Sequence, residues 1–179
     1  MDIKWDTVEL LRHSRHDWLN KLQLIKGNLA LERYERVNDL IEEIVIDARN
    51  EGKLSSLNMP DFAAYLMTYN WRENIIKVDF EVLGDERDLS NCEEDILKWC
   101  KAFFHLLKES VVPHGENHVS LSMEIGEGCV DYYFDIQADW ADREQFETKL
   151  QALETSKELQ CNNYSLHHNE CTIELQMNC

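Results

Sequence analysis

Apolar residues in the first third of the chain recur at the spacing of a helix, and this pattern restricts the fold more than any other feature. In residues 7–31 they lie seven, four, three and four positions apart, and in residues 34–52 three, four, three and four apart. Such spacing places each set on one stripe of an α-helix. The stripes consist of Leu11, Trp18, Leu22, Ile25 and Leu29, and of Tyr34, Val37, Ile41, Ile44 and Ala48.

A short polar break at Glu32–Arg33 separates the two predicted helices, which are therefore expected to form a hairpin. Asp6, with Glu9 in the first turn, is a helix N-cap signal, and the second helix is expected to end near Gly52. A hairpin alone cannot bury two apolar stripes, so they need the rest of the chain or a second copy. Two hairpins paired about a two-fold axis make a four-helix bundle, and we therefore expect a homodimer.

The segment from Gly52 to Pro60 breaks the helical pattern and predicts a boundary between a helical domain, residues 1–55, and a second domain, residues 56–179. Beyond it, helical and strand patterns alternate, which predicts an α+β fold with a mostly antiparallel sheet. Helices are expected at 61–72, 92–111 and 142–154, and strands at 75–84, 118–125, 129–138 and 171–178.

Charge and hydropathy exclude several classes of protein. The net charge is −17, from 35 acidic and 18 basic residues, and such a surface repels nucleic acid and anionic lipid. The chain has no run of about 18 apolar residues, so a membrane span is not predicted. The opening residues lack the pattern of a signal peptide, so we expect a cytoplasmic protein that binds neither nucleic acid nor membrane.

Six cysteines are scattered through the second domain without a CxxC motif or zinc-ligand spacing. In a cytoplasmic chain this pattern is typical of reduced thiols. We therefore expect neither a disulfide framework nor a metal site.

One histidine of the first predicted helix lies away from the apolar stripe. On a helical wheel with Leu11 at zero, His16 falls near 140° and Asn20 one turn further along the same side (approximate angles). One nitrogen of a neutral, exposed imidazole can attack an electrophile while the other donates a proton. Asp17 can orient the ring or share its proton, although adjacent residues on a helix diverge by about 100°.

Basic residues gather around this histidine although the chain is acidic. Arg12 and Arg15 precede it and can offset the charge of an incoming phosphoryl group. Gln23 falls on the same side of the wheel and is a candidate for contact with a partner. His13 also faces outward but lacks the Asp and Asn that follow His16, so it is the second candidate acceptor. An idle solvated histidine is the simplest alternative for His16.

The segment "HDWLN", His16–Asn20, resembles the phosphoacceptor box of sensor histidine kinases: His, then Glu or Asp, then Asn or Thr three residues further. The runs "RHSRHDWLNKLQLIKGNLAL" and "VIDARNEGKLSSL" resemble the sporulation initiation phosphotransferases of endospore-forming bacteria, the B component of the phosphorelay. The resemblance spans nearly the whole chain and is closest in residues 10–57. It implies a dimerising hairpin followed by an α/β sandwich that resembles a kinase ATPase domain without its nucleotide site.

The resemblance also implies a mechanism. His16 takes a phosphoryl group from the aspartate of one response regulator, and the aspartate of a second regulator, a transcription factor's receiver domain, takes it from His16. Asp17 and Asn20 assist His16. Mg²⁺ comes with the receiver domain, and this chain binds no cofactor.

Two alternatives remain open on the sequence. An active ATP-dependent histidine kinase would need asparagines that hold magnesium and a glycine-rich strand end. Here "FFHLLKES" places His105 and Glu109 near those positions, and "DIQADWAD" contains no glycine. The other alternative is a non-catalytic antagonist that binds response regulators through the same hairpin.

Overall fold

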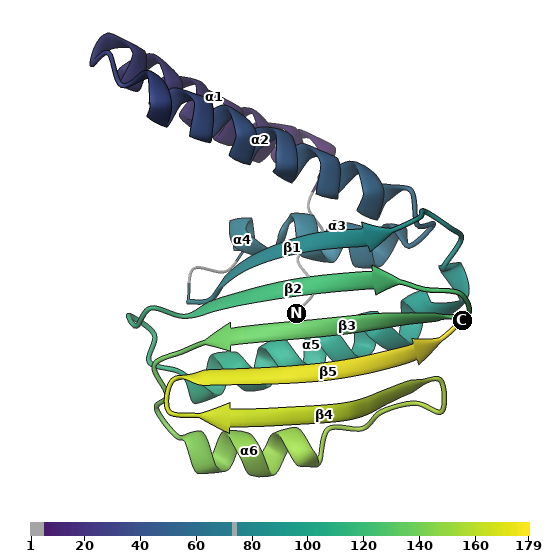
Figure 1. The fold of residues 1–179 in the computed structure, drawn as a ribbon. Helices are drawn as coiled ribbons and strands as arrows, with labels where there is room; N and C mark the ends of the chain where they lie inside the picture. Colours follow the sequence, from purple (N-terminus) through teal and green to yellow (C-terminus); the bar gives the residue numbers. More distant parts are fainter. Residues whose placement is uncertain (1–5, 73–74) are drawn as a thin grey trace. The chain divides into compact units, whose positions relative to one another are not determined.

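The computed structural model describes residues 6–72 and 75–179 and divides into two compact units, Met1–Arg49 and Asn50–Cys179 (Figure 1). The division falls inside the second helix, upstream of the domain boundary expected after residue 55, which stays a prediction. The α+β fold is confirmed. We describe each unit by itself.

The first unit is built from the two predicted helices, α1 (Thr7–Ala30) and the first part of α2 (Tyr34–Ser55). Asp6 is the N-cap of α1, as predicted: its carboxylate accepts hydrogen bonds from the backbone N–H groups of Val8 at 2.7 Å and Glu9 at 3.0 Å. These bonds satisfy two of the N–H groups that a helix start leaves without partners.

The end of α2, expected near Gly52, lies at Ser55, so the helix continues past the glycine. One glycine inside a helix costs about 1 kcal/mol relative to alanine, which a long helix tolerates. The chain turns instead at Asn58, whose φ of 56° leaves the helical region, and Pro60 then starts the next helix.

The apolar stripe of α1 stays exposed in the single chain. The Nζ of Lys21 lies 3.0 Å from Oδ2 of Asp47 on α2, which marks the side of α1 that faces α2. The stripe lies about 80° from that side on the helical wheel. No residue of α1 is buried, and Leu11, Trp18, Leu22 and Leu29 are each about half exposed.

The second unit contains a five-stranded sheet in the order β1-β2-β3-β5-β4 (Figure 1). The β1–β2 pair is parallel and the other pairs are antiparallel, so the expected mostly antiparallel sheet is confirmed. The strands are β1 (Lys77–Gly84), β2 (His118–Ile125), β3 (Cys129–Gln137), β4 (Leu159–His167) and β5 (Glu170–Asn178), and the helices are α3 (Pro60–Met67), α4 (Tyr69–Arg72), η1 (Ser90–Cys92), α5 (Glu93–Ser110) and α6 (Arg143–Gln151).

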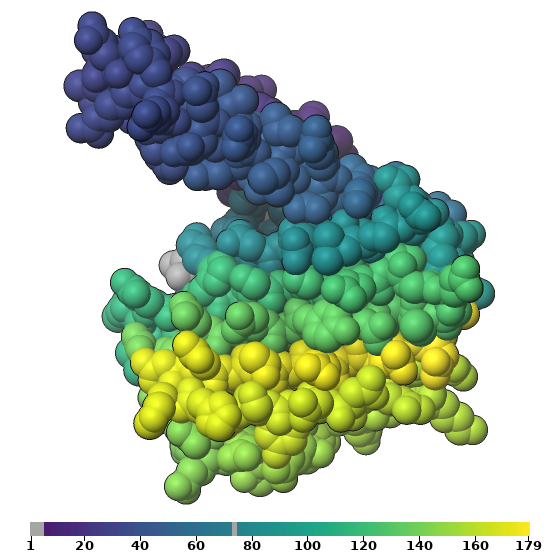
Figure 2. Space-filling view, viewed as in Figure 1, coloured from purple at the N-terminus to yellow at the C-terminus, as the bar shows by residue number. Residues whose placement is uncertain are grey.

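Aromatic side chains join the helices to one face of the sheet. Trp99 and Phe103 of α5 stack with ring centroids 5.0 Å apart, and both contact Phe134 of β3 with centroids 5.3 Å apart. The other face carries Glu81 of β1, Tyr133 of β3 and Glu174 of β5, and Figure 2 shows this face of the sheet from outside. The core of this unit therefore lies between α5 and the inner face of the sheet.

The strand β4 was not predicted from the sequence. Most of its residues are exposed on both sides of the strand, and its sequence "LQCNNYSLH" shows no alternation of apolar and polar residues. An edge strand with a β-bulge between Cys161 and Asn163 needs no such alternation, because it buries little of either face.

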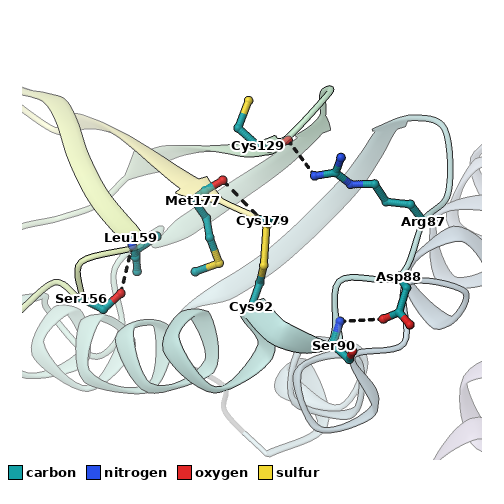
Figure 3. Close-up of a disulfide and its surroundings, with 9 residues drawn as sticks. All are labelled: Arg87, Asp88, Ser90, Cys92, Cys129, Ser156, Leu159, Met177 and Cys179. Atoms are coloured by element: carbon teal, nitrogen blue, oxygen red, sulfur yellow. Dashed lines mark hydrogen bonds between the residues drawn. A yellow bond between two sulfur atoms is a disulfide. The ribbon is translucent and has the colours of Figure 1, made fainter.

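Two cysteines contradict the expectation of reduced thiols. Cys92 and Cys179 pair as a disulfide (Figure 3), with Cα atoms 6.4 Å apart, within the range for such bonds. Their sequence separation of 87 residues gives no sign of the pairing, which follows from the fold of α5 and β5. The remaining cysteines, Cys100, Cys129, Cys161 and Cys171, are free.

Side chains protect the outer edge of β1. The amide of Asn70 donates to the carbonyl of Val78 at 2.7 Å and accepts from its N–H at 2.9 Å, which imitates a neighbouring strand. Further along, Val82 donates to Asn50 at 3.3 Å and accepts from Lys53 at 3.1 Å. These contacts occupy backbone groups that would otherwise offer a pairing edge.

Replacing Asn70 by Ala should destabilise the second unit by about 1–3 kcal/mol, because both half-buried backbone groups of Val78 lose their partner. Urea unfolding followed by near-ultraviolet circular dichroism measures this change. The matched control is Asn162→Ala on exposed β4, which should change stability by less than about 0.5 kcal/mol. Equal effects of the two substitutions would show that the edge contact contributes nothing specific.

Candidate functional site

His16 lies in the middle of α1 with 72% of its side chain exposed. The exposure expected from the helical wheel is therefore observed. The ring reaches solvent because the side of α1 that faces α2 and the apolar stripe both point elsewhere. A large partner can approach it without any rearrangement of the helix.

The two ring nitrogens of His16 have different surroundings. The amide nitrogen of Asn20, one turn later, lies 3.2 Å from Nδ1. A carboxylate oxygen of Asp17 lies 3.8 Å from the same nitrogen, too far for a hydrogen bond but close enough for charge interaction. Among the described residues, the hydrogen bond and ion pair of the ring both involve Nδ1, so Nε2 is the nitrogen available to an incoming group.

The Asn20 amide can decide which nitrogen of His16 carries the proton. When its nitrogen donates to Nδ1, the proton sits on Nε2, which then has no lone pair for attack. A half-turn of the amide brings Oδ1 to the same place, where it accepts from Nδ1–H and leaves the lone pair on Nε2. The second arrangement is the one suited to nucleophilic attack.

The other predicted residues fall at different places on α1. Arg12 precedes His16 by one turn and Gln23 follows it by two, so both lie along its side of the helix, and both are exposed. Arg15 is exposed but diverges from His16 by about 100°. His13 is half-buried and has interactions of its own, so it is less accessible than His16.

The side of α1 that carries His16 continues into a small apolar surface formed by Leu24, Gly27 and Leu31. Both leucines are more than half exposed, and they flank the glycine at helical spacing. A Cβ added at Gly27 would meet no atom within 4 Å, so the chain's own packing does not require glycine here. This surface was not predicted from the sequence. The feature that could have revealed it is the two leucines that lie off the apolar stripe.

The second unit contains the two residues that stand in the sequence near the magnesium-holding asparagines of a kinase. They lie away from any glycine-rich loop. His105 is exposed on α5, its Nε2 lies 3.5 Å from Glu109, and Glu109 also lies 3.8 Å from Nζ of Lys149. These side chains line a shallow cleft of about 530 Å³ between α5 and the segment after α6. Their charges thus pair within the chain.

Asp139, in the segment "DIQADWAD", is also engaged by its own chain. Its carboxylate accepts from the backbone N–H of Glu116 at 3.1 Å and from the Asn169 side chain at 3.4 Å. Gly115 packs so closely that an added Cβ would lie 2.7 Å from the Asp139 side chain. The Asp139 carboxylate is thus engaged by groups of its own chain.

Within residues 6–72 and 75–179, no group of three or more His, Cys, Asp or Glu side chains is arranged to hold a metal ion. In the same residues, none of the helices has the length and apolar character to span a bilayer.

Comparisons with known proteins cover both units. Residues 2–57 match the family model "Sensor_kinase_SpoOB-type, alpha-helical domain", and residues 58–178 match "Sporulation initiation phospho-transferase B, C-terminal". The sporulation initiation phosphotransferase B of Bacillus subtilis (strain 168) is 38% identical over 172 residues, which cover 95% of this chain and 88% of that protein. A blue-light activated histidine kinase of Erythrobacter litoralis EL346 aligns over 99% of this chain and 62% of its own, with 8% identity and a TM-score of 0.51, which shows a shared fold alone.

The contact between Asn20 and His16 gives a prediction for the proton on the ring. Asn20→Asp should move neutral His16 toward the Nδ1–H form, because a carboxylate can only accept. Long-range ¹H–¹⁵N correlation spectra, recorded where the ring is neutral, report this proton position. Asn28→Asp is the matched control, since Asn28 contacts only the Leu24 carbonyl and not the ring. An unchanged His16 spectrum in Asn20→Asp would rule out control by this amide.

Proposed function

Because this chain belongs to the sporulation initiation phosphotransferase B family, we propose that it relays a phosphoryl group between two response regulators through His16. The donor is an aspartyl phosphate on one regulator, and the acceptor is the aspartate of a second regulator that controls sporulation. The observation that supports this best is the exposed ring of His16, with Nδ1 engaged by its neighbours and Nε2 open to solvent.

In the first transfer the lone pair of Nε2 attacks phosphorus, a nitrogen–phosphorus bond forms, and the bond from phosphorus to the aspartyl oxygen breaks. The donor's aspartate leaves as a carboxylate, and Nδ1 keeps its proton, held by Asn20. The phosphorylated ring then carries positive charge, which the Asp17 carboxylate 3.8 Å from Nδ1 stabilises. The second transfer is the reverse reaction toward the other regulator's aspartate.

Charge around the site suits a phosphoryl group. Arg12, one turn before His16, can reach the phosphoryl oxygens. Arg15 lies on a different side of the helix from His16 and contributes at longer range. We expect Mg²⁺ in the acidic pocket of the receiver domain, where it neutralises phosphoryl charge, and we propose that this chain contributes no ligand to it. Catalysis here rests on positioning and on charge stabilisation.

We propose that the receiver domain docks along α1 from Asn20 to Leu31. Gln23 offers a polar contact, and Leu24 and Leu31 offer apolar ones on either side of Gly27. A glycine that its own chain does not require lets a partner's backbone approach the helix closely. This docking would place the regulator's aspartate at the His16 end of the surface.

We also propose that the exposed stripe of α1 is covered by a second copy of the chain, as in a four-helix bundle. Leu11, Trp18, Leu22 and Leu29 form a continuous apolar surface at the spacing typical of helix packing. Since the stripe lies away from His16, the dimer would leave every acceptor histidine accessible.

Replacing His16 by Ala should lower phosphoryl transfer from a phosphorylated receiver domain by about 10³-fold or more, because the covalent intermediate cannot form. Transfer of labelled phosphate to the second receiver measures this loss. His13→Ala is the matched control and should keep most of the activity. Labelled ATP without a regulator should leave His16 unlabelled, whereas labelling would indicate an active kinase. Transfer that survives in His16→Ala would overturn the proposal.

Leu22 and Leu24 provide a test that separates dimer formation from docking. Each is 55% exposed in the single chain, but Leu22 belongs to the stripe and Leu24 to the His16 side of α1. Leu22→Glu should weaken the dimer by about 100-fold or more, because it places an unpaired charge in the apolar interface. Leu24→Glu should keep the dimer and lower transfer by about 10-fold or more.

Sedimentation velocity gives the oligomeric state, and the transfer assay gives activity. If both variants lose the dimer equally, the docking surface and the dimer surface are not separate. A monomeric parent protein would exclude the bundle.

A further inference from the structure

The disulfide between Cys92 and Cys179 joins the two layers of the second unit (Figure 3). Cys92 is the N-cap of α5, and Cys179 directly follows β5. The link therefore connects the start of the core helix to the end of a central strand. It is unrelated to the phosphoryl-transfer residues, all of which lie on α1.

The two sulfurs are held close by contacts that do not depend on the bond between them. Cys179 donates its N–H to the carbonyl of Gly128 at 3.0 Å, and Asn178 donates to Glu158 at 2.9 Å, so the strand end is fixed by backbone pairing. Cys92 is fixed by its place at the start of α5 in the core. The pair can therefore open and close without loss of the surrounding fold.

The two cysteines differ in access to solvent. Cys92 is only 4% exposed, whereas Cys179 is exposed. A thiol reagent therefore reaches Cys179 first, and Cys92 is placed to attack the product. This order is that of an attacking thiol and a resolving thiol.

We propose that Cys92 and Cys179 form a reversible redox staple, closed by exchange with a small disulfide such as oxidised glutathione. The Cys179 thiolate attacks one glutathione sulfur, forms a mixed disulfide and releases one glutathione thiolate. The Cys92 thiolate then attacks the Cys179 sulfur, forms the internal disulfide and releases the second glutathione. Overall, two protein thiols are oxidised and one glutathione disulfide is reduced to two glutathione thiols, which take up the two protons that the cysteines lose.

Three of the four remaining thiols are poor competitors for the first attack on the glutathione disulfide. Cys100 and Cys171 are buried, and burial raises the pKa of the Cys171 thiol to about 12, which leaves almost no thiolate near pH 7. Partial burial also raises the pKa of the exposed Cys161. In a chain expected in the cytoplasm, a disulfide of this kind is more often redox-responsive than structural.

The test uses the full-length protein equilibrated with mixtures of oxidised and reduced glutathione, followed by mass spectrometry of the intact chain and of its peptides. The parent protein should lose two thiols together and show a Cys92–Cys179 peptide pair. Cys92→Ser should stop at one glutathione on Cys179. Cys179→Ser, the matched variant, should show no glutathione on buried Cys92.

Thermal unfolding supplies a second readout. The difference in melting temperature between oxidised and reduced protein should disappear when either cysteine is replaced. Closing a loop across 87 residues should raise the melting temperature of the oxidised parent by about 5–10 °C over the reduced parent. Either serine variant should melt at the same temperature in both conditions. Glutathione on Cys92 in Cys179→Ser, or six free thiols in the oxidised parent, would overturn the proposal. Neither result bears on phosphoryl transfer through His16.

Discussion

The interactions available to α1 depend on one constraint. Its apolar stripe stays exposed to solvent in the single chain. The helix meets α2 along the side marked by the Lys21–Asp47 pair, and the stripe through Leu22 lies on another side. What remains is the side that carries His16. One helix thus has three separate sides: one faces α2, one is the exposed stripe that we propose a second copy covers, and one carries His16.

The chemistry of His16 follows from its position on this helix. Residues one turn apart lie side by side, so Asn20 reaches Nδ1, whereas the adjacent Asp17 stays at 3.8 Å and acts only through its charge. Both act on the nitrogen nearer the backbone, and Nε2 at the tip of the ring stays open. The short "HDxxN" pattern therefore places two polar groups near Nδ1, and the two orientations of the Asn20 amide correspond to the two proton positions of the ring.

Structural features could be predicted from the sequence where a residue's environment depends on its near neighbours in the chain. Prediction failed where the environment is set by distant segments. The Asp6 cap, the two long helices and the exposure of His16 follow from neighbours within one or two turns. The strand β4 was missed because an edge strand buries too little to impose alternation on its sequence. The Cys92–Cys179 pair was missed because only the packing of α5 against β5 brings the two residues together. Leu24 was missed because a single exposed leucine on a helix has no distinct pattern.

In the second unit, the charged groups of Asp139 and Glu109 have partners within their own chain. Asp139 accepts from backbone and side-chain donors of its own chain, and Glu109 pairs with both His105 and Lys149. Groups satisfied in this way gain little from a charged ligand, because binding would first have to break existing contacts and leave the displaced donors unpaired. The aromatic packing of Trp99 and Phe103 against Phe134 needs none of these polar groups. The aromatic core and the polar contacts of Asp139 and Glu109 thus involve different residues of this unit.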